Sequence, residues 1–250
     1  MSHEIETLGI IGGDGAFGTL TDVLCGRFAP HVRVKLHSQT KSRGNKRYYD
    51  LAAVVKCDAV VVAVPIRVYE EVLHRIKPML GEHSILVDVA TVKMHPSALC
   101  RELFPAQPRL NIHAMFGPGS YKKSNGDVKG FPIVVTEHSL FPDQYARMIR
   151  FAQSLGFDVI EMTSEEHDRR LSETLFIAHL QSQTLKRGKL LETTSFDTPS
   201  VRLMKEAAEI VANDTELFRD VVHFNPFCRD AMIRYMQAQS FIWDLLHDAK

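Results

Sequence analysis

Residues 8–18 decide the fold, and they read LGIIGGDGAFG. The short apolar run from Leu8 to Ile11 ends in glycines, and apolar residues then recur at helical spacing from Phe17 to Phe28. A strand that enters a glycine turn and continues into a helix is the context of the G-x-G-x-x-G dinucleotide fingerprint. We therefore predict a phosphate-binding loop and helix start formed by Gly13, Asp14, Gly15, Ala16, Phe17 and Gly18. A strand-to-helix turn without a ligand would show the same pattern.

Each glycine of the fingerprint has an expected task. We expect Gly13 to make the tight turn and Gly15 to let the backbone approach the pyrophosphate. Gly18 should allow helix and strand to pack closely.

The end of the second predicted strand, His31 to Leu36, selects the dinucleotide. An acidic residue at this place bonds the ribose 2′-hydroxyl and favours NAD. Residues 36–43 read LHSQTKSR and contain no acid, so the segment favours NADP, with NAD as the alternative. The side chains suited to a 2′-phosphate are Ser38, Thr40, Lys41 and Arg43. A solvated basic loop is the other interpretation of this segment.

Strands alternate with helices through the first two-thirds of the chain. The β-branched run from Ala59 to Val64 is typical of a strand buried on both faces of a parallel sheet. Further strands are expected at 84–89, 110–116, 131–136 and 157–162, with helices at 68–80 and 141–155. The pattern predicts an α/β fold with a doubly wound, mostly parallel Rossmann-type sheet.

The chain after Met162 contains no convincing strand. We expect a nucleotide-binding domain over 1–163 and an all-helical domain over 164–250. Ser164 is the expected cap of a long helix that reaches about Glu192, on which Asp168 and His179 would share a face. Pro199 suits the first turn of a later helix. Lys122, Lys123 and Lys129 are expected in a solvated loop.

Composition excludes several classes of protein. The 250 residues carry 30 Lys plus Arg and 30 Asp plus Glu, so no basic excess supports a nucleic-acid or membrane-surface partner. Apolar runs are too short for a membrane span. Four scattered cysteines without a C-x-x-C pair argue against a disulfide framework or a metal site, and a cytoplasmic location is expected.

Three more segments lie where strands are expected to end, which is where such folds bind ligands. They begin at Val64-Pro65, at Asp88 (DVATVK) and at His113 (HAMFGP), and the E-H-D segment at Glu166 precedes His179 by thirteen residues. Together with the glycine loop, and in this order along nearly the whole chain, they resemble the prephenate dehydrogenase family. That family includes arogenate and cyclohexadienyl dehydrogenases of tyrosine biosynthesis.

The resemblance implies a reaction and a set of residues. It implies NAD(P)-dependent oxidative decarboxylation of prephenate or arogenate, with an active site between the two domains and a homodimer formed by the helical one. His113 matches the catalytic histidine that takes the proton of the ring hydroxyl, Thr91 matches the residue that supports it, and His179 matches a histidine that faces the substrate. Val64 and Pro65 are expected near the cofactor, and Gly117 near the substrate.

The chain also departs from the family pattern. His113 is followed by Ala114 where the family has proline, and Glu209 stands where an arginine that binds the ring carboxylate is expected. Arg202 and Arg219 are the candidates to replace that arginine. The substrate is therefore open between prephenate, arogenate and another cyclohexadiene, imine or hydroxy acid. A non-catalytic dinucleotide-binding regulator is a third possibility.

Overall fold

The computed structural model describes residues 5–40 and 46–248, with the side chain of Asp248 excepted. Lys41 and Arg43 lie outside the described residues. The chain forms two compact units, Met1–His167 and Asp168–Lys250, which are described separately below. The domain boundary expected between residues 163 and 164 stays a prediction.

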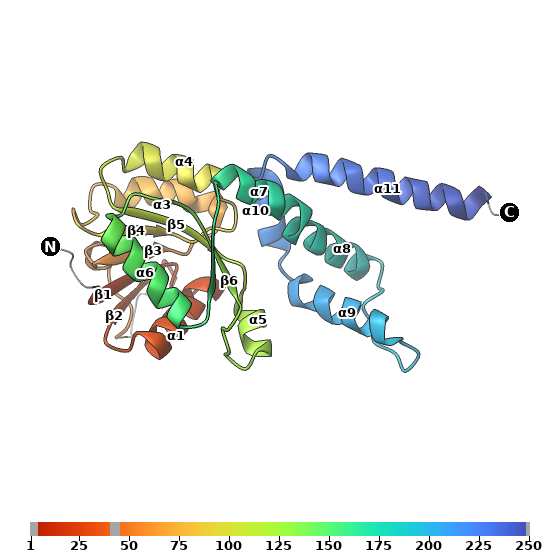
Figure 1. Ribbon diagram of the computed structural model, residues 1–250, viewed down its shortest axis with the longest axis horizontal. Helices are drawn as coiled ribbons and strands as arrows, with labels where there is room; N and C mark the ends of the chain where they lie inside the picture. Colours follow the sequence, from red (N-terminus) through yellow and green to blue (C-terminus); the bar gives the residue numbers. More distant parts are fainter. Residues whose placement is uncertain (1–4, 41–45, 249–250) are drawn as a thin grey trace. The chain divides into compact units, whose positions relative to one another are not determined.

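The first unit is built on a seven-stranded sheet in the order β2-β1-β3-β4-β5-β6-β7 (Figure 1). All neighbouring strands are parallel except β5 and β6, so the predicted mostly parallel, doubly wound sheet is confirmed. The strands are β1 (Thr7–Ile11), β2 (Arg33–His37), β3 (Ala59–Val62), β4 (Ile85–Asp88), β5 (Arg109–Ala114), β6 (Pro132–His138) and β7 (Asp158–Glu161).

Helices cover both faces of this sheet. One face carries α2, α3 and α4, and the other carries α1 and α6 (Figure 1). The helices are α1 (Ala16–Phe28), α2 (Leu51–Val54), η1 (Ile66–Val68), α3 (Tyr69–Ile76), α4 (Met94–Leu103), α5 (Pro118–Lys123) and α6 (Pro142–Ser154). Strand β3 shows why two layers are needed: Val60 and Val62 pack toward α3, whereas Ala59 and Val61 pack toward α6.

The second unit is helical over its described residues. Its helices are α8 (Leu175–Arg187), α9 (Pro199–Val211), α10 (Thr215–Phe224) and α11 (Cys228–Asp248), and α7 (Ser164–Glu173) leads into it. Helix α8 packs against α9, α10 and α11. Pro199 occupies the first turn of α9, as predicted, and Thr198 caps it by accepting a bond from Val201 N. Within the described ranges, no helix has the length and apolar character needed to cross a membrane.

The prediction of one long helix from Ser164 to about Glu192 is wrong. The helix breaks at Thr174, whose φ of −117° and ψ of −86° are not helical and whose hydroxyl bonds Arg170 O. Because of this break, the shared face expected for Asp168 and His179 does not follow from helical spacing. Gly188 then ends α8 before Glu192.

Two smaller expectations also need correction. The cap of α7 is Thr163 rather than Ser164, since Thr163 Oγ1 accepts a bond from Glu166 N at 3.1 Å. Lys122 and Lys123 lie in the last turn of the short helix α5 rather than in a loop, because Pro118 starts a helical turn there.

Candidate functional site

The candidate residues of the first unit gather along one edge of the sheet. The glycine loop follows β1, Ser38 follows β2, Val64 and Pro65 follow β3, and Thr91 follows β4. His113 lies at the carboxyl end of β5, beside the end of β4, because Asp88 of β4 pairs with Asn111 of β5. The strand order reverses between β1 and β3, which is the point where open α/β sheets bind ligands.

The glycine loop has the backbone that a close approach to phosphate requires. Its left-handed residue is Gly12, with φ of +85°, so Gly12 makes the tight turn that the sequence analysis gave to Gly13. A Cβ on Gly13 would lie 2.9 Å from Cβ of Leu36, so Gly13 serves packing against β2. A Cβ on Gly18 would lie 2.1 Å from Gly12 O, which explains its glycine.

The helix that follows is open at its N-terminus. Gly15 is the N-cap of α1, and no side chain caps the helix. The nearest atom to a Cβ on Gly15 is Gly12 O at 3.2 Å, so the outer side of the loop has room for a ligand. Ala16 and Phe17 form the first turn, where amide groups and the helix dipole favour an anion. These residues fit the diphosphate of a dinucleotide.

A pocket of about 240 Å³ opens between this loop and the end of β2. It brings together Asp14, Ser38, Thr40, Val64 and Pro65, all of which the sequence placed near the cofactor. Thr40 Oγ1 donates a hydrogen bond to Asp14 Oδ2 at 2.6 Å, and Ser38 Oγ lies 3.1 Å from Thr40 Oγ1. Glu71 and Arg75 of α3 also line the pocket. Neither residue could be predicted from the sequence, because both lie on a helix and belong to no motif.

A buried ion pair lies behind the ends of β4 and β5. Lys93 Nζ lies 2.6 Å from Asp88 Oδ2 and donates a second bond to Ile112 O at 2.6 Å, and both side chains are 0% exposed. Asp88 also accepts bonds from Ala90 N and Asn111 Nδ2. The pair therefore fixes the strand directly before His113. Because its charge is buried and paired, Lys93 is not placed to attract a substrate from solvent.

His113 contacts a second buried histidine. Its Nδ1 lies 2.9 Å from Nε2 of His167, and the two side chains belong to residues only 5% and 3% exposed. Burial holds the pKa of His113 well below its ordinary range, and His167 and Lys93 lower that pKa further. His113 is therefore neutral at physiological pH and keeps one nitrogen lone pair. The sequence signal for His167 is the E-H-D segment at Glu166, which is part of the family resemblance.

Thr91 and Gly117 lie in the turns that follow β4 and β5. Thr91 is half-buried, three residues beyond the strand end at Asp88. Gly117 is the N-cap of α5, with an extended backbone and no atom within 4 Å of a Cβ built on it. Neither packing nor backbone conformation therefore explains why residue 117 is glycine.

His179 is the buried candidate of the second unit. It lies on α8, is 2% exposed, and its ring is parallel to that of Phe218 with the ring centres 6.3 Å apart. Its Nδ1 is buried and has no hydrogen-bond partner among the described residues. Burial lowers its pKa, and Asp214 opposes that shift. A buried, unbonded ring nitrogen on a helix is a feature that ligand binding would satisfy.

The two candidate arginines of the second unit are both exposed. Arg202 lies on α9, and Arg219 on α10 pairs with Glu216 at 2.8 Å. Glu209 is exposed on α9, seven residues after Arg202. Seven residues are about two helical turns, so Arg202 and Glu209 share a face of α9.

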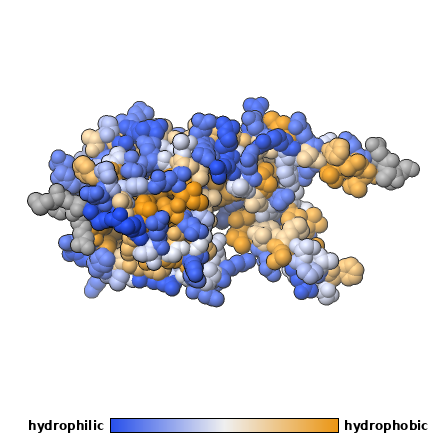
Figure 2. Space-filling model, in the orientation of Figure 1, coloured by the Kyte–Doolittle hydropathy of each residue, from blue (hydrophilic) through white to orange (hydrophobic). Residues whose placement is uncertain are grey.

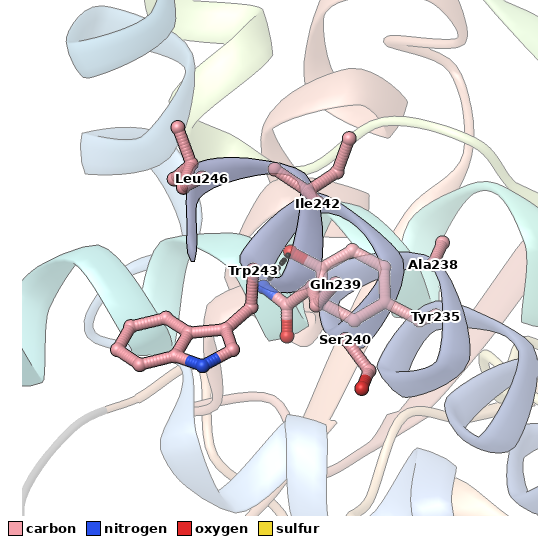
Figure 3. Close-up of a pocket in the computed structure, with 7 residues that line it drawn as sticks. All are labelled: Tyr235, Ala238, Gln239, Ser240, Ile242, Trp243 and Leu246. Carbon is pink, nitrogen blue, oxygen red and sulfur yellow. Dashed lines mark hydrogen bonds between the residues drawn. The ribbon is translucent and has the colours of Figure 1, made fainter. Parts of the chain in front are cut away.

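Helix α11 carries an apolar groove of a different kind. Figure 3 shows that one helix supplies the whole lining, and Gln239 Nε2 bonds Tyr235 OH within it. Trp243 is 62% exposed there, and Figure 2 shows apolar surface on α11 just before the terminal residues. A single helix face does not enclose a small molecule, and large apolar side chains stay exposed on it. The lining residues of the groove are Tyr235, Ala238, Gln239, Ser240, Ile242, Trp243 and Leu246.

No group of three or more His, Cys, Asp or Glu side chains that could hold a metal ion occurs in the part of the chain that the structure describes.

Comparison with known proteins finds similarity to prephenate and arogenate dehydrogenases. Residues 36–156 match the family model described as prephenate dehydrogenase, nucleotide-binding domain. The chain is 25% identical over 232 residues to the T-protein of Haemophilus influenzae, covering 89% of this chain and 57% of that protein. It is 28% identical over 185 residues to a probable arogenate/prephenate dehydrogenase of Methanocaldococcus jannaschii, covering 71% and 41%. The chain thus spans about half the length of the curated relatives it matches.

The fold has a solved counterpart. A crystal structure of prephenate dehydrogenase from A. aeolicus, in complex with hydroxyphenyl propionate and NAD+, superposes with a TM-score of 0.75 at 16% identity. The match covers 99% of this chain and 93% of that one.

Proposed function

We propose that the chain belongs to the prephenate dehydrogenase family and that it oxidises and decarboxylates prephenate or arogenate, with NADP preferred over NAD; its similarity to members of that family supports the proposal. A bound nicotinamide would supply the acceptor for a hydride from the ring carbon that carries the hydroxyl, and loss of the ring carboxylate as carbon dioxide would then make the ring aromatic. The open first turn of α1 and the glycine loop support the binding of the dinucleotide. Lys41 and Arg43 are the proposed contacts of the 2′-phosphate, with Ser38 and Thr40.

His113 is the proposed acceptor of the hydroxyl proton. Its lowered pKa keeps it neutral, and a base must be neutral to take a proton. Since Nδ1 of His113 faces His167, we assign Nε2 to the substrate hydroxyl. Thr91 supports the same hydroxyl from the turn after β4. This buried, neutral His113 is the single observation that carries the proposal.

The second unit would bind the rest of the substrate. His179 offers a buried nitrogen without a protein partner, and Arg202 or Arg219 would supply charge for a carboxylate. Gly117 would lie beside the ring. We also propose a homodimer through the helical unit, since α11 exposes Met236, Trp243 and Leu246.

The test is turnover of each substrate with each dinucleotide. Purified protein is given prephenate or arogenate with NADP or NAD, and the absorbance of reduced cofactor is followed. We expect turnover in at least one pair, a higher kcat/KM with NADP, and a loss of about 10³-fold or more in His113→Asn. Circular dichroism of the variant controls for folding. Equal activity of the variant would refute the role of His113.

A second candidate function keeps the fold and changes the substrate. The exposed Glu209 supports it, because a carboxylate on α9 would repel a substrate carboxylate. Protein that binds the dinucleotide yet turns over neither substrate would favour this candidate, and a panel of other cyclohexadiene, imine and hydroxy acids would then be assayed. Dinucleotide binding with no turnover of any acid would favour a regulator.

A further inference from the structure

The pocket beside the glycine loop contains a carboxylate at its ribose end. In Rossmann-type folds the residue after β2 contacts the ribose 2′-position, and the glycine loop contacts the diphosphate. Asp14 belongs to the glycine loop by sequence, but its Oδ2 lies 2.6 Å from Thr40 Oγ1, three residues beyond the end of β2. The acid that the β2 segment lacks is therefore supplied from the loop.

The hydroxyl groups around Asp14 are arranged for this carboxylate. Thr40 N donates to Ser38 Oγ at 3.1 Å, and the hydroxyl hydrogen of Thr40 points to Asp14. A hydroxyl has one hydrogen to donate. Thr40 must therefore give up its bond to Asp14 before it can donate to a 2′-phosphate, which lowers the value of Thr40 as a phosphate ligand.

Charge acts in the same direction as this hydrogen bond. A ribose with free hydroxyl groups can donate to Asp14, as it does to the acid of NAD-binding folds. A phosphate monoester carries a charge of about −1.5 to −2 near neutral pH and is repelled by a carboxylate in the same small pocket. Arg75 and Glu71 of α3 also line the pocket; Arg75 would attract the phosphate and Glu71 would repel it, so α3 supplies one charge of each sign.

We propose that Asp14 is a specificity-determining residue that binds the adenosine ribose hydroxyls and disfavours the 2′-phosphate. The inference rests on the proposed function only in requiring that the loop binds a nicotinamide dinucleotide. Asp14 acts against the contribution of Lys41 and Arg43, and it therefore limits the preference for NADP. Specificity then results from one attractive and one repulsive element.

The test uses binding alone, so it does not depend on the substrate. NADH and NADPH are titrated into the full chain, and their fluorescence gives a Kd for each. Asp14→Asn should tighten NADPH at least tenfold and weaken NADH several-fold, which inverts or widens the ratio of the two constants. Asp14→Ser should act in the same direction, and it serves if the first variant does not fold. Asp143→Asn, on the exposed first turn of α6, makes the same change of charge far from the loop and should leave both constants within twofold.

The outcomes are separable. Wild-type protein that binds neither dinucleotide would overturn the proposed cofactor, and this inference with it. If the wild-type protein binds either dinucleotide and the ratio of the Kd values for NADH and NADPH is unchanged in both Asp14 variants, only the role of Asp14 is overturned.

Discussion

The buried pair of Asp88 and Lys93 gives the sharpest prediction of stability. In Lys93→Met the carboxylate of Asp88 stays 0% exposed and loses its cation at 2.6 Å, and Ile112 O loses a donor. Removing one partner of a buried ion pair costs about 3–5 kcal/mol, because the other charge is left unpaired. We expect a loss of roughly 4 kcal/mol in the free energy of unfolding of the first unit, with a fall in Tm on the order of 8–16 °C.

A double variant separates charge from packing. Asp88→Asn in the Lys93→Met background removes the unpaired charge and keeps an oxygen for Ala90 N. We expect it to recover about 2 kcal/mol of the loss. Arg33→Met is the matched control, because Arg33 and Glu6 form a pair of exposed side chains at 3.9 Å, and an exposed pair contributes about 0–1 kcal/mol.

The assay is chemical unfolding followed by far-UV circular dichroism. The only tryptophan, Trp243, lies on α11, so its fluorescence follows the second unit and shows whether that unit is affected. The reasoning is refuted if Lys93→Met costs less than about 1 kcal/mol. It is also refuted if the double variant is no more stable than the single one.

Three further predictions test other parts of the chain. In Gly18→Ala the new Cβ would meet Gly12 O at 2.1 Å, so we expect loss of dinucleotide binding and at least about 2 kcal/mol of destabilisation. Burial lowers the pKa of His113, so below about pH 6.5 the unfolded chain binds a proton at His113 and the folded chain does not. The Tm of the wild-type protein should therefore fall as the pH falls below about 6.5. The Tm of His113→Asn should fall less over the same pH interval. Trp243→Glu with Leu246→Glu should convert a dimer to monomers by light scattering, because both side chains are exposed and apolar.

Matched variants control these experiments. Gly26 lies on the same helix as Gly18 and has no atom within 4 Å of a new Cβ. Gly26→Ala should therefore stabilise by about 0.5–1 kcal/mol and keep binding; loss of binding in both variants would contradict the role of Gly18. Gln237 is exposed on α11 and does not line the apolar groove, so Gln237→Glu should leave the oligomer intact. If the Tm of His113→Asn falls with pH as much as that of the wild type, other groups cause the pH dependence. A wild-type protein that is monomeric by light scattering would contradict the proposed dimer.

Residues 59–62 show what could be predicted from sequence. Four consecutive apolar residues form a strand buried on both faces, because a central parallel strand has helices on both sides. Helix α4 was missed for a complementary reason. Its buried face includes Ser97, which bonds Asn111 Nδ2, so a polar contact between distant segments replaces the apolar periodicity on which a sequence pattern depends.

The site residues also divide into those that a sequence pattern indicates and those that it does not. His113 and Thr91 could be found because strand ends carry function in this fold, and they stay predicted site residues. The helix break at Thr174 has no glycine or proline to mark it. The bond between Asp14 and Thr40 joins residues 26 apart in the chain, and sequence alone shows only that the end of β2 has no acid. A motif within one segment does not show a charge that another segment supplies.

The residues proposed for the chemistry and those proposed for substrate choice lie in different units of the chain. The first unit holds the proposed residues for the chemistry: the phosphate loop, His113 and the ion pair that fixes the strand of His113. Lys93 is buried and bound to Asp88, so it is not a receptor for a substrate carboxylate. The residues that we propose for binding a substrate carboxylate lie in the second unit, where Arg202 and Glu209 share a face of α9 with opposite charges. We therefore expect chemistry and substrate choice to depend on different residues.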